Sequence, residues 1–304
     1  MTVKIRPGTN EDLFGAFVVF RLALYRLNQS LELASPENKP DPETLSAHFE
    51  IFRIYTEHLA QTADQFWVAE DEGEIIGFSR STLRDGIRQL SELFVQPEKQ
   101  SRGVGKRLLE AAFPSEGANN RVIISSPDVR AVTRYLKSGL KFRFTIYDWG
   151  RKPEIVPFES DLSIEPFSAS PENLAILNSI DRTILGYTRE VDHIWLSKNR
   201  RGHFYRRDGN VVGYSYVSNR IGPIAMLHNH DFHTALAHVE SEMTKYIDDV
   251  FNEFFVTIPM INTAAVEYVL KRDCQATPFV EHFMSDKPLG QYENYIFMDP
   301  PLIT

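Results

Sequence analysis

Residues 90–113, LSELFVQPEKQSRGVGKRLLEAAF, constrain the fold of this chain more than any other stretch. Residues 90–95 are apolar and strand-like, and Pro97 ends the strand pairing because its nitrogen carries no hydrogen. Gly103 and Gly105 then lead into an amphipathic helix. The first turn of a helix has unpaired amide hydrogens and a partial positive charge, and glycine lets an anion approach that backbone closely. The stretch therefore predicts a strand-turn-helix unit that binds an anion, such as a pyrophosphate, at its turn.

Two well-known phosphate motifs do not fit this turn. A P-loop requires a glycine five positions before Gly105 and a Ser or Thr after Lys106, but Gln100 and Arg107 stand at those positions. A dinucleotide-binding fingerprint requires a third glycine where Leu108 stands. Both motifs are therefore excluded.

The pattern that does fit is Val-x-Pro-x-x-x-Gln-x-x-Gly-x-Gly, which runs from Val95 to Gly105. It resembles the acetyl-CoA-binding motif of the GNAT superfamily of N-acetyltransferases, in which loop amides hold the pyrophosphate of the cosubstrate. Ser101 stands where that family often has glycine. The resemblance implies that acetyl-CoA is the cosubstrate. It also implies cofactor contacts from the residues of the strand end and turn, Phe94, Val95, Gln100, Ser101, Arg102, Gly103, Val104, Gly105 and Lys106.

A second family element follows the predicted strand 121–125. In PDVRAVTRYLKSGLKF, Ala131, Tyr135 and Gly139 are spaced by four, which resembles the family pattern Asn-x-x-Ala-x-x-x-Tyr-x-x-x-Gly-Phe. Asp128 replaces the Asn and is a further cofactor contact by resemblance, while Leu140 replaces the Phe. At helical spacing Ala131 and Tyr135 share one face, which in the family looks toward the cofactor.

The resemblance implies that Tyr135 is the general acid that protonates the departing sulfur. A tyrosine of ordinary pKa, about 10, is protonated at neutral pH and can donate that proton. The alternative is a core aromatic on an amphipathic helix, which is the commoner fate of a single tyrosine.

Glu92 is the candidate base or amine anchor, because family members often place an acidic residue in this strand. Strict alternation puts Glu92 on the face of Leu90 and Phe94, but a β-bulge, common in the family near this point, would shift that parity. Two alternatives stay open: Glu92 is a solvated edge charge, or the amine loses its proton through water. Around the phosphate, Lys106 and its basic neighbours are either ligands or solvated helix-start residues.

The order of predicted elements indicates one design used twice. In the first half we expect strands at 3–6, 65–70, 75–83, 89–95, 121–125 and 142–149 and helices at 10–28, 42–61, 104–113 and 128–138. In the second half we expect strands at 162–166, 223–227, 254–258, 277–284 and 292–298, a hairpin at 202–219, and helices at 171–184, 191–198, 232–247 and 263–272. Two prolines and scattered charges mark a linker at 151–161.

The prediction is therefore an α/β protein of two tandem GNAT-like domains, each a mixed, mostly antiparallel sheet flanked by helices, at residues 1–152 and 160–304. The length of 304 residues is about twice the ~150-residue prior for one domain. The second half lacks the glycine motif in IGPIAMLHNHDFH and has Val269 where Tyr135 stood. We therefore expect a degenerate second domain without catalysis.

Charge and composition exclude several classes of protein. The net charge of −8 argues against a nucleic-acid-binding protein, and residues 1–153 carry 21 Lys+Arg against 20 Asp+Glu, so a polyanionic ligand fits the first half better than the acidic second half. No apolar run approaches the ~18 residues of a membrane span and no signal pattern is visible, so we expect a cytoplasmic protein that does not bind membranes. Cys274 is the single cysteine and excludes an internal disulfide framework.

The histidines of HNHDFH, His228, His230 and His233, lack a known zinc pattern, so we expect no metal site. The function that the sequence predicts is an N-acetyltransferase that moves acetyl from acetyl-CoA to a primary amine of a small molecule or peptide by direct attack. The alternatives are a non-catalytic acyl-CoA-binding or regulatory module, and an acyltransferase that acts on a hydroxyl or thiol. We expect a monomer or a homodimer.

Overall fold

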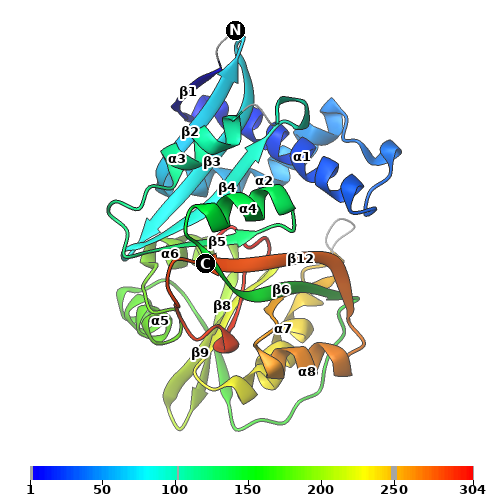
Figure 1. Ribbon diagram of the computed structural model, residues 1–304. Helices are drawn as coiled ribbons and strands as arrows, with labels where there is room; N and C mark the ends of the chain where they lie inside the picture. The colour runs from blue at the N-terminus through cyan, green and yellow to red at the C-terminus, as the bar shows by residue number, and fades with distance from the viewer. Residues whose placement is uncertain (1–2, 101–102, 248–251, 304) are drawn as a thin grey trace. The chain divides into compact units, whose positions relative to one another are not determined.

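The computed structural model describes residues 3–100, 103–247 and 252–303. The chain packs as two compact units (Figure 1). The first comprises Met1–Ile123 and Asp128–Gly139, and the second comprises Ile124–Pro127 and Leu140–Thr304. Each unit combines a sheet with helices, so the predicted α/β class is confirmed.

The sheet of the first unit has the strand order β1-β2-β3-β4-β5. Its strands are β1 (Lys4–Pro7), β2 (Ala63–Asp71), β3 (Glu74–Arg84), β4 (Ile87–Val95) and β5 (Asn120–Ser125). Neighbouring strands are antiparallel except β4 and β5, which are parallel. The mixed, mostly antiparallel sheet was predicted, and the predicted strand positions agree with it.

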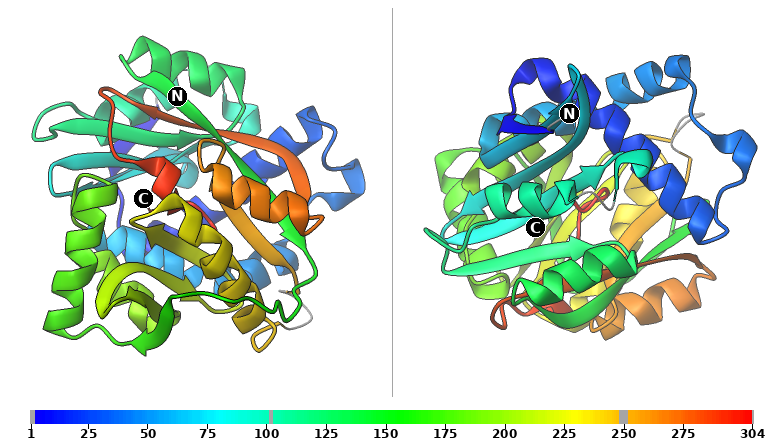
Figure 2. Two further views of the ribbon diagram at one scale, coloured as in Figure 1. Left: turned by 90° about the horizontal axis from the view of Figure 1, so that it is seen from below. Right: turned by 45° about the horizontal axis from the view of Figure 1, so that its top comes forward.

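Helices cover both faces of this sheet (Figures 1 and 2). They are α1 (Leu13–Ser30), α2 (Pro42–Thr62), α3 (Val104–Ala112) and α4 (Val129–Lys137). Val68 packs with Ala16 and Val19 of α1, whereas its neighbour Ala69 packs with residues of α3. Adjacent strand residues point to opposite faces, so α1 and α3 lie on opposite faces of the sheet.

Acid-glycine turns close the hairpins of both units. Glu72 and Gly73 between β2 and β3 have φ angles of 53° and 85°. Asp208 and Gly209 in the second unit have φ angles of 49° and 80°. Two consecutive left-handed residues form the type I′ turn, whose twist matches that of a two-stranded hairpin.

The second unit repeats the element order. Its elements are β6 (Lys141–Arg151), β7 (Ser163–Phe167), α5 (Pro171–Ile184), α6 (Glu190–Asn199), β8 (Arg201–Arg207), β9 (Asn210–Val217), β10 (Ile221–Met226), α7 (Phe232–Met243), β11 (Phe254–Pro259), α8 (Thr263–Lys271), β12 (Gln275–Ser285) and β13 (Tyr295–Ile296). One sheet has the order β13-β10-β9-β8-β7, and β6 lies between β11 and β12. The helix expected at 232–247 ends at Met243, and of the strand expected at 292–298 only Tyr295–Ile296 is a named strand, preceded by a 3-10 turn at Tyr292–Asn294.

Strand β6 packs differently from the expected division of the chain. It pairs antiparallel with both β11 and β12, so residues 140–151 belong by packing to the second unit, whereas we placed them before the boundary at 152. An isolated strand leaves its backbone groups unpaired, and β6 finds partners on both edges in the second unit. The limits of the two halves as independent folding units stay a prediction.

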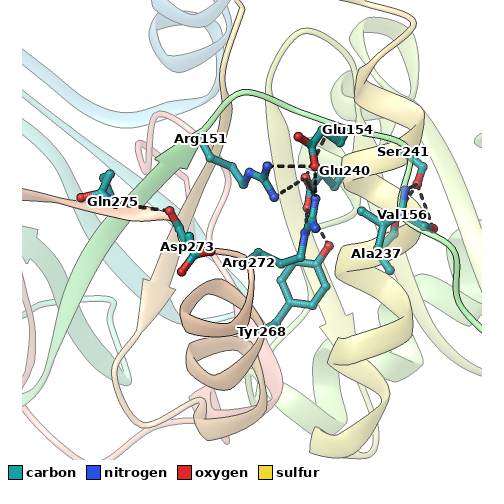
Figure 3. A network of polar contacts seen from close by, with 10 residues as sticks. All are labelled: Arg151, Glu154, Val156, Ala237, Glu240, Ser241, Tyr268, Arg272, Asp273 and Gln275. Atoms are coloured by element: carbon teal, nitrogen blue, oxygen red, sulfur yellow. Dashed lines mark hydrogen bonds and ion pairs between the residues drawn. The ribbon is translucent and has the colours of Figure 1, made fainter.

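The linker predicted at 151–161 is irregular after Arg151 and is held against α7 and α8 (Figure 3). The buried carboxylate of Glu240 accepts hydrogen bonds from Tyr268 at 2.7 Å and from Arg272 at 2.9 Å, and lies 3.5 Å from Arg151. The amide of Val156 donates to the hydroxyl of Ser241 at 2.8 Å. These contacts fix the start of the linker on the second unit.

Candidate active site

A β-bulge in β4 decides where Glu92 points. Arg80 of β3 lies opposite Glu92 and Ser81 lies opposite Leu90, so Ser91 is the additional residue. Residues directly opposite each other share a face. Ser81 donates to the carbonyl of Ala112 in α3, whereas Arg80 donates to the carbonyl of Thr56 in α2. The bulge therefore puts Glu92 on the α2 face, opposite Leu90, and strict alternation was wrong here.

Glu92 is buried at 6% exposure, so a solvated edge charge is wrong for this residue. Its Oε2 atom lies 2.5 Å from Nε of Arg80, which is 1% exposed. The two atoms are poorly aligned for a hydrogen bond, so the contact is an ion pair. Burial raises the pKa of the Glu92 carboxyl, and the Arg80 guanidinium lowers it in part. The result is a carboxyl whose proton affinity is higher than that of an ordinary glutamate.

The turn after β4 is open backbone with a helix N-terminus behind it. Gly103 caps α3 with a φ of 78°, and a Cβ at this position would meet no atom within 4 Å. The amides of Lys106 and Arg107 both donate to the carbonyl of Gly103 at 3.2 Å. The amide groups that precede them at the helix start have no partner one turn back along the helix. The turn can therefore offer amide donors to an anion.

The end of β4 beside this turn lies beyond the residues that pair with β5. The pairing of β4 with β5 ends at Leu90 and Ile123, immediately before the bulge. The carbonyl of Val95 accepts a hydrogen bond from the side-chain amide of Gln100 at 3.1 Å, so Gln100 holds the strand end to the turn. The Phe94 side chain packs against Phe20, with ring centroids 4.9 Å apart. Phe94 and Val95 thus contribute to the core through their side chains. The amide of Gln96 donates to the carbonyl of Ile76 in β3 at 2.8 Å, so the backbone groups of Phe94, two residues earlier, also face β3, and only those of Val95 face the other edge of β4.

The structure describes only some of the residues that were predicted to contact the phosphate at this turn. Ser101 and Arg102 lie outside the described residues. Lys106 is exposed, and its ammonium lies 3.7 Å from Glu110 one turn along α3. Val104 and Gly105 are buried in the first turn of the helix.

Arg134 of α4 is a residue of this site that the sequence analysis missed. An added Cβ at Gly105 would lie 3.4 Å from Nη1 of Arg134, so the guanidinium lies against the first turn of α3. Arg134 immediately precedes Tyr135 in the second motif. Its spacing was a usable signal, because Arg134 lies three residues after Ala131 and therefore on the same side of α4.

Tyr135 and Asp128 have different environments on α4. Tyr135 is 4% exposed, and burial raises the pKa of its phenol, while the charge of Asp128 adds to this and that of Arg134 opposes it. Asp128 caps the helix: Oδ1 accepts from the amide of Arg130 at 2.9 Å, and the carboxylate also pairs with the Arg130 side chain. Tyr135 therefore keeps its proton at neutral pH, and Asp128 is engaged by the start of its own helix.

The corresponding parts of the second unit are filled by the chain itself. The N-cap of α7 is Asp231, whose carboxylate is held by Arg207 at 2.7 Å. At the start of α8, Oδ1 of Asn229 accepts from the amide of Ala264 at 3.3 Å, and Oδ1 of Asn262 accepts from that of Ala265 at 3.1 Å. Strand β13 pairs with β10, and Phe297 forms a bridge to Thr257 of β11. The chain thus occupies the space between β10 and β11.

The three histidines of HNHDFH pair with carboxylates or with each other. His230 lies 3.1 Å from Asp231 and His233 lies 3.5 Å from Glu267, while the rings of His228 and His230 stack. Within the described ranges, no group of three or more His, Cys, Asp or Glu side chains is arranged to hold a metal ion. Among those residues, no helix combines the length and apolar character needed to cross a bilayer.

Residues 62–139 match the sequence profile of the acetyltransferase (GNAT) domain. This stretch contains the bulge, the glycine turn and α4. The resemblance to the GNAT superfamily is therefore confirmed, and it supports acyl transfer as the general activity. A search of curated protein sequences gives no significant match.

Solved structures extend the likeness to the whole chain. A putative acetyltransferase from Pyrococcus horikoshii is similar at 15% identity, with a TM-score of 0.68 over 96% of this chain and 92% of that one. A tandem GNAT protein from the clavulanic acid biosynthesis pathway has 14% identity and a TM-score of 0.57 over 94% and 99%. A GCN5-related N-acetyltransferase from Sphaerobacter thermophilus has 11% identity and a TM-score of 0.59 over 94% and 96%. At these identities the likeness shows the fold, which is that of tandem GNAT proteins.

Proposed function

We propose that the first unit binds acetyl-CoA at the turn after β4 and transfers its acetyl group to a primary amine by direct attack. The observation that carries this proposal is the left-handed, open Gly103 at the start of α3, beside a strand edge whose pairing with β5 ends at Leu90. The backbone amides of this turn would hold the pyrophosphate, with Arg134 as an additional cation. The strand edge would pair with the amide groups of the pantetheine arm.

The proposed chemistry has one bond made and one broken. The neutral amine nitrogen attacks the thioester carbonyl, the carbon–sulfur bond breaks, and the thiolate takes the proton of Tyr135. A phenol with a raised pKa remains a donor across the neutral range. Glu92 would accept the amine proton, directly or through water, because a carboxyl with a raised pKa is a better base than an ordinary glutamate. The remaining rate acceleration comes from the alignment of the amine with the thioester.

Replacement of Tyr135 by Phe tests the acid role. We expect about a 100-fold lower kcat with an unchanged Kd for acetyl-CoA, because general acid catalysis typically contributes 10²–10⁴-fold. The assay follows release of free CoA thiol with a panel of amines, alcohols and thiols. Tyr268→Phe is the matched control, since it removes a buried phenol that donates to Glu240 in the second unit. An unchanged kcat in Tyr135→Phe removes the acid role, and turnover of alcohols or thiols alone changes the acceptor class.

A further inference from the structure

Arg21 of α1 is a partly buried cation without a partner. Its Nε atom is buried and makes no hydrogen bond, and no ion pair to Arg21 is formed within the described part of the chain. Two other arginines of the first unit are paired with carboxylates: Arg6 with Asp12 at 2.8 Å and Arg88 with Asp64 at 2.7 Å. Burial lowers the pKa of Arg21, yet a guanidinium remains charged at neutral pH. A positive charge is therefore held at α1 without a carboxylate partner among the described residues.

His48 of α2 lies close to this cation. Its Nδ1 atom is buried without a hydrogen-bond partner, and both burial and the charge of Arg21 lower the pKa of His48. The two helices pack through Phe17 and Phe49, whose ring centroids are 5.4 Å apart. Arg21 is one helical turn beyond Phe17, and His48 immediately precedes Phe49. Two unpartnered nitrogens from different helices thus converge on one place.

The lack of a counter-ion at Arg21 has a cost in folding free energy. A desolvated cation without a counter-ion destabilises a fold unless another molecule supplies the opposite charge. The guanidinium is the side chain best shaped to hold a carboxylate or a phosphate, because its donors form a fixed fork. A pair of nitrogens of this kind is therefore suited to an anionic ligand.

The same face of α2 leads from His48 toward Glu92. His48 and Thr56 are eight residues apart, so they share one stripe of the helix and are separated by roughly 12 Å along its axis. The carbonyl of Thr56 accepts a hydrogen bond from Arg80, the ion-pair partner of Glu92. A site for an anion and the candidate base thus lie on the side of the sheet covered by α2.

We propose that Arg21 and His48 bind an anionic group of the acceptor, so that the acceptor is an amine that also carries a carboxylate or a phosphate. This inference rests on the proposed function for the amine end of the molecule. The near-neutral charge of residues 1–153, compared with the acidic second half, favours an anionic acceptor over a polyamine.

The first experiment measures acetyl transfer to matched pairs of amines by the full-length protein. One arm uses ω-amino acids of increasing chain length with their neutral amides, and the other uses glucosamine 6-phosphate with glucosamine. We expect at least one anionic member to exceed its neutral partner more than tenfold in kcat/KM. Arg21→Met should remove that preference, whereas Arg26→Met, an arginine on the same helix that bonds only to Gln29 at 3.4 Å in the described structure, should keep it.

A second experiment is independent of turnover. We expect the preferred anionic amine, or glucosamine 6-phosphate and 6-aminohexanoate if no amine is acetylated, to move the NMR signals of the His48 ring at constant pH in the wild type and in Arg26→Met, but not in Arg21→Met. We also expect Arg21→Met to raise the melting temperature of the unliganded protein, because it removes a partly buried charge that has no ion-pair partner among the described residues. A purely structural arginine would lower it.

The outcomes separate the two proposals. Acetylation of no amine, together with the expected His48 shift, contradicts the proposed function and leaves the anion site standing. Equal turnover of charged and neutral partners, or a His48 signal that no anionic probe moves, overturns the anion site whether or not amines are acetylated.

Discussion

The two halves of the chain form the corresponding strand-to-helix turn from different residues. After β4, the helix begins at Gly103, whose backbone is left-handed and faces open space. After β10, the helix begins at Asp231, whose carboxylate is fixed by Arg207. Asp231 accepts no hydrogen bond from the amides of α7, but a negative side chain at a helix N-terminus disfavours a phosphate there. The turn after β4 is open at Gly103, whereas the corresponding turn after β10 carries an ion pair of the protein's own side chains.

The strands next to these turns show the same contrast. The pairing of β4 with β5 stops before the bulge, whereas β13 and Phe297 bridge the space between β10 and β11. The second unit therefore keeps the order of elements while the groups that a cosubstrate would meet are used by its own chain. Repetition of a fold does not by itself repeat a site.

Among the variants that test the difference between the two units, the largest effect is expected for a change at Glu92. Glu92→Gln should lower kcat/KM by about 100-fold, because the base is lost while the shape is kept. A base acts only after it loses its proton, so in the wild type the rate should rise with pH through the raised pKa of Glu92. The pH profile of kcat/KM checks this, and the rising limb should disappear in the variant. A variant that keeps the wild-type limb shows that another group, or the amine itself, controls it.

A smaller effect is expected at Arg134. Arg134→Ala should weaken acetyl-CoA binding by about tenfold, since one charge-assisted hydrogen bond contributes roughly 1.5–3 kcal/mol and a tenfold change is 1.4 kcal/mol. Calorimetry with acetyl-CoA and with pantetheine, which lacks the pyrophosphate, measures it. The loss should appear only with acetyl-CoA and not in Arg130→Ala, a residue of the same helix that pairs with Asp128. Equal losses with both ligands contradict the phosphate contact.

The smallest predicted effect tests whether the helix start of the second unit serves stability alone. Asn229→Ala should lower the free energy of unfolding by about 1–2 kcal/mol, because Oδ1 accepts from the amide of Ala264 and Nδ2 donates to Asn262 at 2.9 Å. Denaturant unfolding measures the change. The affinity for acetyl-CoA should not move, and weaker binding of acetyl-CoA in this variant would place a ligand in the second unit.

The sequence predicted the parts of the fold that depend on local pattern. Short apolar strands, acid-glycine turns and amphipathic helices carry their own periodicity, so most of the expected elements are present in the structure, including the repeat. The face of Glu92 depended on a bulge that only the pairing of β3 with β4 fixes. Arg21 and His48 were missed because their role depends on which buried atoms lack partners, and that requires tertiary packing. Arg134 was missed although its spacing from Ala131 was a usable signal. The pairing of β6 was missed for the same reason, since strand partners are chosen at long range.

The most direct test of the account is a calorimetric titration of the full-length protein with acetyl-CoA, repeated with Gly103→Glu and Gly209→Glu. Both glycines have φ angles near 80° and no atom within 4 Å of an added Cβ, so both changes impose a similar backbone strain. We predict one site per chain in the wild type and in Gly209→Glu, and at least 100-fold weaker binding in Gly103→Glu, where the new carboxylate repels the pyrophosphate. Two sites, or unchanged binding in Gly103→Glu, would contradict a single cosubstrate site at the turn after β4.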